Sequence, residues 1–97
     1  MTEKEAKTEI IRRAKDLNPT LHIGKDKLKE SVLDELRAQI KAHRIVKVRV
    51  LPNSESETVD IANSLAEATN SVVVDVRGNV LVLTDKRTWI SLSQKKF

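Results

Sequence analysis

The segment from Leu21 to Leu51 constrains the fold more than any other part of the chain, because its apolar residues change period twice. Leu21 and Ile23 alternate with a polar residue, and Gly24 then interrupts the alternation. Apolar residues next recur every three or four positions, as on one face of a helix, and after His43 they recur every second position, as in a strand. Two strands joined by a helix in so short a span predict a parallel, right-handed βαβ unit. The helical set is Val32, Leu33, Leu36 and Ile40, and the strand set is Val46, Val48 and Val50.

The same segment also concentrates positive charge. Residues 22–51 hold eight basic and four acidic residues, whereas residues 52–70 hold four acidic residues and no basic one. Several of the cations precede the predicted helix, whose backbone N–H groups already favour phosphate. The fold should therefore have a basic and an acidic side, and the basic side points toward a nucleic-acid backbone. The cations of the segment are Lys25, Lys27, Lys29, Arg37, Lys41, Arg44, Lys47 and Arg49.

The length of 97 residues predicts a single domain over residues 1–97, with its core at about residues 5–92 and a loose tail at 93–97. Aromatic residues make up only 2%, so Val, Leu, Ile and Ala must build the core. The absence of cysteine excludes disulfides, thiolate catalysis and cysteine-ligated zinc. His22 and His43 are the only histidines, and we predict neither a metal site nor a cofactor.

The first ten residues are charged and contain no hydrophobic run, so we expect neither a signal peptide nor a membrane span, and the default reading is a cytoplasmic protein. The chain carries no P-loop, dinucleotide-binding fingerprint or paired catalytic carboxylates, and the spacing of its serine, histidine and aspartate residues suggests no nucleophilic triad. We therefore predict a protein without enzymatic activity or a small-molecule substrate.

Two further helices are predicted outside the central segment. Thr2 and Glu5 have capping-box spacing, which predicts a helix over residues 3–15 that ends before Asn18-Pro19. A helix over residues 55–69 should end at Asn70, and its inward residues should be Val59, Ala62, Leu65 and Ala66. The central helix could be capped by Ser31 with Asp34, or by Asp26 if it starts earlier.

Residues 71–77 and 80–84 predict a β-hairpin around a Gly78-Asn79 turn. Period-two alternation places Val72, Val74 and Val76 on one face of its first strand, and Val73, Asp75 and Arg77 on the other. A final apolar patch predicts a short edge strand at Trp89, Ile90 and Leu92.

The predicted order α-β-α-β-α-β-β gives an α/β (α+β) fold with two layers, in which helices cover one face of a small mixed four-stranded sheet. That face should carry Val46, Val48 and Val50. Lys47, Arg49 and Arg77 should then lie on the other face or along a rim.

At this point the residues resemble a known family, the chloroplast RNA splicing and ribosome maturation (CRM) domain, in its single-domain prokaryotic, archaeal-like form. The resemblance covers about residues 5–92. Its matching features are LHIGK at residues 21–25, the helix with Val32, Leu36 and Ile40, IVKVRV at residues 45–50, the helix end AEATN and the hairpin VVVDVRGNVLVLT.

The resemblance implies an RNA-binding domain with the fold of the C-terminal domain of bacterial translation initiation factor three. It implies ribosomal RNA as the partner, within a ribosomal subunit or its precursor and with the large subunit favoured, so the protein would be a ribosome assembly or ribosome-associated factor. It also implies a KH-like GxxG loop at residues 24–27, where this chain keeps Gly24 but has Lys27 in place of the second glycine. Thr84-Asp85 stands where relatives often carry a Tyr-Arg pair.

The candidate RNA-binding residues fall into four groups, one of which is Lys47 and Arg49, two outward cations of a strand that normal solubility would also require. Gly24 could simply end a strand, and the lysines after it could be a solvated cluster. The cations of the central helix lie on one helical face and could instead pair with Glu30 and Asp34. Arg77 and the cations beyond the hairpin could form a second contact zone. The candidates are Gly24, Lys25, Lys27, Lys29, Arg37, Lys41, Arg44, Lys47, Arg49, Arg77, Lys86 and Arg87.

Two other functions remain open from the sequence. The chain could be a DNA-coating chromatin protein of the Alba kind, which would dimerise, whereas the RNA-binding hypothesis takes a monomer. It could also be a protein-interaction module that uses the acidic third helix, with the basic side serving only solubility.

Overall fold

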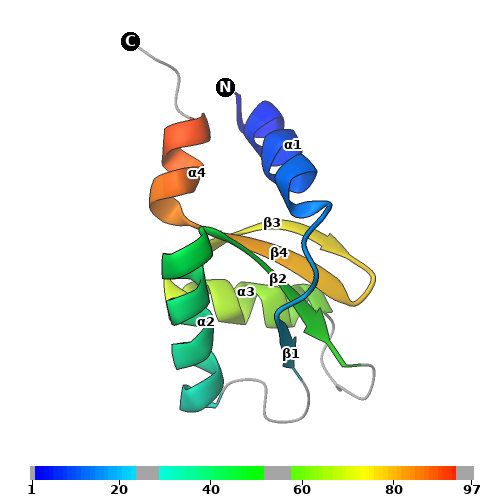
Figure 1. Ribbon diagram of the computed structural model, residues 1–97, viewed down its shortest axis with the longest axis vertical. Helices are drawn as coiled ribbons and strands as arrows, with labels where there is room; N and C mark the ends of the chain where they lie inside the picture. The colour runs from blue at the N-terminus through cyan, green and yellow to red at the C-terminus, as the bar shows by residue number, and fades with distance from the viewer. Residues whose placement is uncertain (1, 24–28, 52–57, 94–97) are drawn as a thin grey trace.

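The computed structural model describes residues 2–23, 29–51 and 58–93. Within them the chain forms four helices and four strands (Figure 1). In chain order they are α1 (Glu3–Ala14), β1 (Leu21–Ile23), α2 (Glu30–His43), β2 (Ile45–Val50), α3 (Thr58–Thr69), β3 (Ser71–Arg77), β4 (Val80–Asp85) and α4 (Lys86–Ser93).

The four strands form one mixed sheet in the order β1-β2-β4-β3. β1 is parallel to β2, with Leu21 opposite Val48, which confirms the predicted βαβ unit. β3 and β4 form the predicted hairpin, with Arg77 opposite Val80. Gly78 has φ +57° in its turn, a conformation that glycine adopts without steric cost. The mixed four-stranded sheet is therefore as the sequence predicts.

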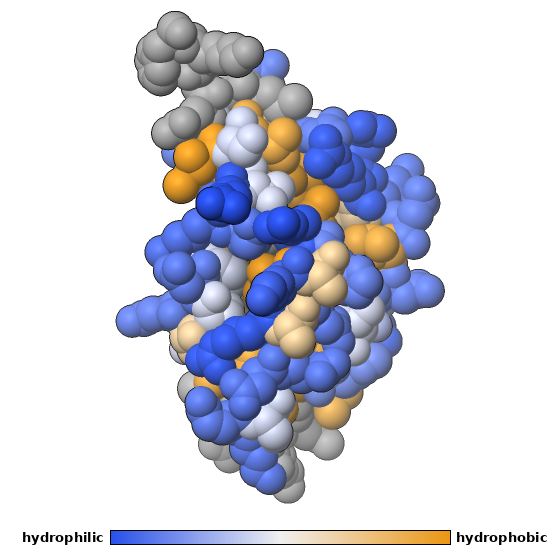
Figure 2. Space-filling view, turned by 60° about the vertical axis from the view of Figure 1, so that its left-hand side comes forward, coloured by the Kyte–Doolittle hydropathy of each residue, from blue (hydrophilic) through white to orange (hydrophobic). Residues whose placement is uncertain are grey.

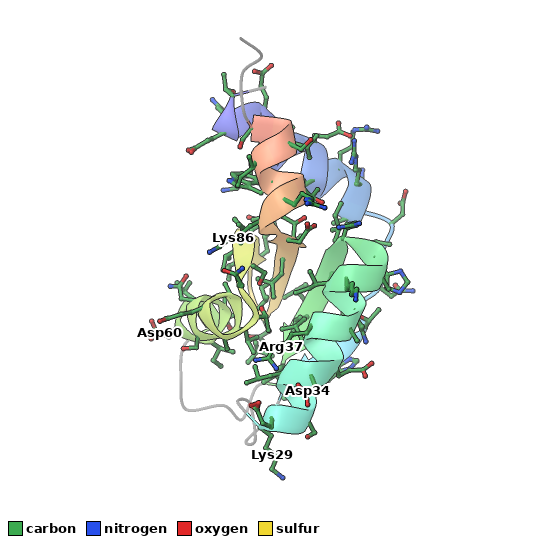
Figure 3. The ribbon with its side chains drawn as sticks, turned by 90° about the vertical axis from the view of Figure 1, so that its left-hand side faces the viewer. Lys29, Asp34, Arg37, Asp60 and Lys86 are labelled. Atoms are coloured by element: carbon green, nitrogen blue, oxygen red, sulfur yellow. The ribbon has the colours of Figure 1, made fainter. Side chains whose placement is uncertain are left out.

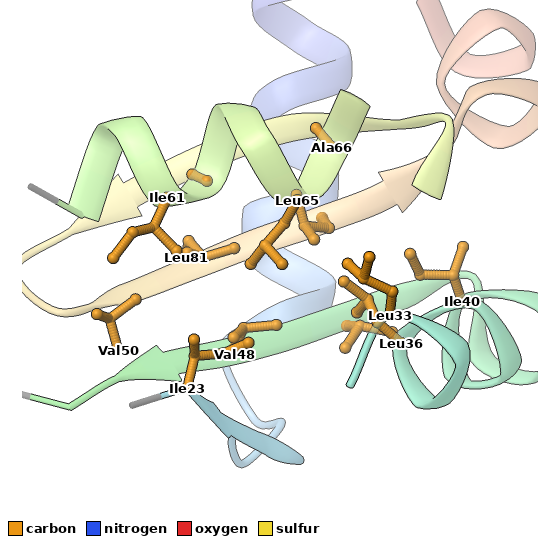
Figure 4. Packing of buried hydrophobic residues seen from close by; sticks show 13 residues of the cluster. Ile23, Leu33, Leu36, Ile40, Val48, Val50, Ile61, Leu65, Ala66 and Leu81 are labelled. Atoms are coloured by element: carbon orange, nitrogen blue, oxygen red, sulfur yellow. The ribbon is translucent and has the colours of Figure 1, made fainter. Parts of the chain in front are cut away.

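Helices cover both faces of this sheet, and the predicted one-sided arrangement is wrong. α2 and α3 pack on the face that carries Val46, Val48 and Val50, as predicted (Figure 4). Ile45 and Val82 point to the opposite face and are also buried, because α1 and α4 cover that part of the sheet. This smaller cluster consists of Ile10, Ala14, Ile45, Val74 and Val82, with Ile11, Trp89 and Leu92 packed against it.

The inward face of α3 differs by one residue from the prediction. Val59, predicted to point inward, is 51% exposed, whereas Ile61 is 2% exposed and packs in the main core. Ala62, Leu65 and Ala66 are buried as predicted. α3 ends at Asn70, whose φ of 55° confirms the predicted C-terminal stop.

A β-bulge between Val73 and Asp75 changes the predicted faces of β3. Val73 and Val76 pack on the main core, whereas Val74 belongs to the cluster on the opposite face. The strict alternation predicted for this strand is wrong because the bulge inserts an extra residue and shifts the register by one.

The start of α1 is as predicted and the start of α2 is not. The Thr2 hydroxyl accepts from the Glu5 N–H at 3.1 Å, and the Thr2 N–H donates to the Glu5 carboxylate, which completes the capping box. α2 begins after Lys29 without a side-chain cap, so Ser31 lies in its first turn and does not cap it. Asp26 lies outside the described residues.

The last element is a helix, α4, and the predicted edge strand at Trp89–Leu92 is wrong. Asp85 caps this helix, since its Oδ2 accepts from the Thr88 N–H at 3.1 Å. Trp89 and Leu92 are spaced by three residues and turn to the same side, where they pack on the second cluster beside α1. The apolar run is too short for its period to be read from the sequence, whereas the cap at Asp85 favours a helix.

Candidate nucleic-acid interface

Cations from α2 and from the first turn of α4 lie on one side of the molecule. Figure 3 shows Lys29 at the start of α2, Arg37 between α2 and α3, and Lys86 at the start of α4. Figure 2 shows that hydrophilic side chains cover most of this side. We define the α2–α4 surface by the exposed cations of α2, of its two caps and of the first turn of α4, which are Lys29, Arg37, Lys41, Arg44, Lys86 and Arg87.

The end of α2 meets the start of α4 because β2 and β4 are antiparallel neighbours, with Ile45 opposite Thr84. The Thr84 hydroxyl donates to the Arg44 carbonyl at 2.8 Å, and an Arg44 guanidinium nitrogen lies 3.5 Å from Asp85 Oδ2. Cations that are more than 40 positions apart in the sequence are thereby joined in one surface. Thr84 is fully buried, so this position offers no surface on which a base could stack.

Arg37 holds α2 to α3 as well as contributing charge. Its guanidinium donates to the Ala68 carbonyl at 3.0 Å, near the C-terminal end of α3. It also lies 2.9 Å from Asp34 and 4.0 Å from Glu30, so the ion-pair interpretation of this helical face is confirmed for Arg37. The side chain is still 42% exposed. Its remaining N–H donors can face a ligand.

The other α2–α4 cations differ in how far they are neutralised. Lys41, Lys86 and Arg87 form no ion pair within residues 2–23, 29–51 and 58–93. Arg44 is paired with Asp85 and has φ 71°, a backbone conformation that disfavours a residue with a Cβ. The surface therefore offers at least three lysine or arginine side chains that have no ionic partner in the described parts of the chain and whose charge can meet a phosphate.

Asp85 is the acidic centre of this junction. Partial burial raises the pKa of its carboxyl, but the hydrogen bonds from Thr88 and the charge of Arg44 outweigh burial, so the pKa lies below its usual value. Its charged form is therefore favoured by folding. It fixes the start of α4 beside the end of α2.

Replacing Asp85→Asn should make the protein less sensitive to acid. Because the pKa of Asp85 is lowered by folding, the carboxylate stabilises the fold fully above its unfolded pKa of about 4 and loses this effect as the pH falls through the folded value. Asparagine keeps a capping oxygen without the charge. Urea unfolding at several pH values should show the wild type more stable than the variant at neutral pH, with a difference that shrinks below about pH 4. A difference independent of pH would contradict this assignment.

The remaining sequence-predicted cations lie on the other face of the sheet. Lys47 and Arg49 alternate with the core residues of β2 and point away from α2 and α3, as predicted. Arg77 lies beside the hairpin turn and pairs with Asp75 at 2.9 Å. The length of β4 separates it from Lys86, so the structure does not bring Arg77 together with Lys86 and Arg87.

Two cations that the sequence interpretation did not single out lie close to Lys47. Arg12 and Lys15, at the end of α1, line the same surface depression as Lys47 and Arg77. The basic run at residues 12–15 is visible in the sequence as a candidate anion-binding segment. Only the packing of α1 on the sheet shows that this run lies near Lys47.

The lysine loop, with the predicted residues Gly24, Lys25 and Lys27, lies outside the described residues. Among the described residues there is no group of three His, Cys, Asp or Glu side chains that could hold a metal ion. No helix in the same part of the chain is long and apolar enough to cross a membrane.

Comparison with known proteins gives a consistent result. A protein of Bacillus subtilis (strain 168), named Probable RNA-binding protein YqeI, is 30% identical over 71 residues, which are 73% of this chain and 74% of that protein. A protein of Haemophilus influenzae (strain ATCC 51907 / DSM 11121 / KW20 / Rd), named RNA-binding protein, is 31% identical over 70 residues, 72% of this chain and 71% of that protein. Both relatives are bacterial, so the archaeal likeness suggested by the sequence has no support here.

The fold agrees with these sequence relationships. The solution structure of the hypothetical protein SAV1595 from Staphylococcus aureus, described as a candidate RNA binding protein, matches with a TM-score of 0.74 and 27% identity. The match covers 89% of this chain and 90% of that structure. Residues 1–83 match the family described as the CRS1 / YhbY (CRM) domain. The chain therefore belongs to the CRS1/YhbY (CRM) domain family.

Proposed function

We propose that this protein binds RNA without catalysis, through the α2–α4 surface and the lysine loop with Gly24, Lys25 and Lys27. The observation that carries this proposal is the meeting of the end of α2 with the start of α4, which brings Arg44 beside Asp85 and next to the exposed Lys86 and Arg87. Membership of the CRM family and the names of its relatives support RNA as the ligand.

Contacts of this kind are directed at the phosphate backbone. Lysine and arginine side chains neutralise phosphates and release condensed counterions, so affinity should fall steeply with salt. The surface offers no aromatic platform at Thr84, and base stacking is the usual source of sequence preference in single-stranded RNA recognition. The protein should therefore read the shape of a folded RNA and show little sequence specificity.

Within this function we infer that the RNA is ribosomal, in a subunit or its precursor, with the large subunit favoured. The support is the family resemblance, which implies a role in subunit assembly or in association with the ribosome. A cytoplasmic, monomeric protein that contacts a preformed particle fits this inference.

Sedimentation of a lysate tests this proposal. The protein should travel with a ribosomal subunit or precursor at low salt and move to the top of the gradient as salt rises. Binding weakens because the free energy gained by releasing counterions from the phosphates falls as the salt concentration rises. Purified ribosomal RNA and duplex DNA should then compete for the protein at equal salt. Absence from every particle at low salt would overturn the ribosomal inference, and preference for duplex DNA would favour the coating function instead.

A further inference from the structure

A groove on the opposite side of the sheet from α2 and α3 has no role in the proposed interface. It has a volume of about 550 Å³, within the range of pockets that hold small organic groups. In Figure 1, α1 stands above the sheet with its C-terminal end toward it, and the hairpin of β3 and β4 extends to the right. The floor of the groove is apolar and is made by Ile11, Ala14, Val80 and Val82.

The rim of the groove is basic. Arg12 and Lys15 come from α1, Lys47 from β2 and Arg77 from β3, whereas Asp75 is the one acid among the described lining residues. Lys47 lies directly beside the floor, since it is paired with Val82 across the strands.

Only part of this charge is neutralised. Arg77 is 2.9 Å from Asp75, and Arg12 shares the carboxylate of Glu9 with Arg13, each at 2.7 Å. Hydrogen bonds from these two arginines hold the pKa of Glu9 below its usual value, so the carboxylate stays charged. Lys15 and Lys47 form no ion pair within residues 2–23, 29–51 and 58–93. The groove thus combines an apolar floor with uncompensated positive charge at its edge.

We propose that this groove holds one nucleotide of a single-stranded RNA segment, with its base on the apolar floor and its phosphates on Lys47 and Lys15. A base offers a flat face to aliphatic side chains and carries a phosphate on either side, which matches a floor edged by cations. A duplex keeps its bases stacked and would bring only phosphates to this site, leaving the floor exposed. Guanidinium planes such as those of Arg12 and Arg77 also stack on bases.

This proposal rests on the proposed function and gives it a second contact. The molecule measures 24 × 22 Å across its short axes, so one folded RNA with a single-stranded flank can reach both sides. The α2–α4 surface would hold the folded part and the groove would hold the flank. Particles with unpaired segments would then be preferred over fully paired RNA.

The test uses the full-length protein with two probes, an unstructured oligouridylate containing 4-thiouridine and an RNA hairpin without overhangs. Lys47→Glu should lower the affinity for the oligouridylate about tenfold and reduce its salt slope by about 0.7 or more, because a phosphate contact is lost. Its affinity for the hairpin should stay within about twofold of the wild type, well below the effect of one lost phosphate contact. Lys7→Glu makes the same charge change on an exposed part of α1 outside the groove and should leave both affinities unchanged.

Photocrosslinking locates the bound strand directly. Crosslinked peptides should contain residues 11–15, 47 or 80–82, and crosslinks confined to the α2–α4 surface would overturn the groove proposal. A wild type that binds the hairpin but not the oligouridylate would overturn this proposal alone, and one that binds neither would overturn the proposed function as well. An effect of Lys47→Glu on self-association or on binding of an acidic peptide, with RNA affinity unchanged, would assign the groove to protein.

Discussion

Reversing the charges of Lys41 and Lys86 together should lower the affinity for a structured RNA by at least about tenfold, because phosphate contacts on both helices of the α2–α4 surface are lost. Neither side chain forms an ion pair within the described parts of the chain, so replacing them breaks no intramolecular salt bridge there. The melting temperature should therefore change little. Titrations at several salt concentrations should show a slope of log affinity against log salt that is smaller by roughly 1.8, the value for two contacts to a duplex.

The matched control reverses Lys4 and Lys7, two exposed residues of α1 that lie outside the α2–α4 surface. This variant has the same net charge as the test variant, so it separates a local contact from a general electrostatic effect. Equal loss of affinity in both variants would mean that only net charge matters. This result would contradict the α2–α4 surface as the docking site.

Replacing Leu36→Ala should have the largest effect on stability. Leu36 is fully buried on α2 and packs in the main core between α2 and the sheet (Figure 4). Truncation removes apolar contacts and leaves a cavity, which costs about 2–5 kcal/mol. This is a large part of the total stability of about 5–15 kcal/mol that is typical of single domains. Chemical denaturation followed by circular dichroism measures the change.

Leu17→Ala serves as the control, because Leu17 is 41% exposed and its truncation should cost less than about 1 kcal/mol. Similar losses for the two variants would contradict the packing of α2 described above. The Leu36 variant also tests whether RNA binding by the α2–α4 surface needs a tightly packed α2. Its RNA affinity can be compared with that of the wild type at a temperature where the variant remains folded.

The central part of the fold follows from the sequence because the spacing of its apolar residues is unambiguous. The strict alternation of β2 and the helical spacing of α2 specify their inward faces, and the parallel βαβ unit follows from their order. The two main errors lie where local pattern and tertiary packing compete. The apolar residues of α4 fit a strand or a helix equally well, and the bulge in β3 leaves no mark in a run of valines.

The sequence identifies individual cations of the proposed interface but not their arrangement. Charge counting identifies Lys41 and Lys86, yet it cannot show that they belong to one surface, because that depends on the pairing of β2 with β4. The bond from Arg37 to Ala68 spans 31 positions and has no signal in the sequence. Lys47 was identified as outward-facing, whereas its neighbours from α1 became visible only once α1 was placed on the sheet.

Arg44 is a point of local frustration in an otherwise consistent fold. Its φ of 71° would suit glycine. The free-energy cost of this conformation is offset in part by the ion pair of the side chain with Asp85 and in part by the hydrogen bond that the Arg44 carbonyl accepts from Thr84. Retaining a side chain in such a conformation costs on the order of 1–3 kcal/mol. Conflicts between local preference and global fold are expected chiefly where a residue serves function. The backbone strain at Arg44 is therefore a thermodynamic reason, beyond the number of cations, to expect that the junction of α2 and α4 serves function.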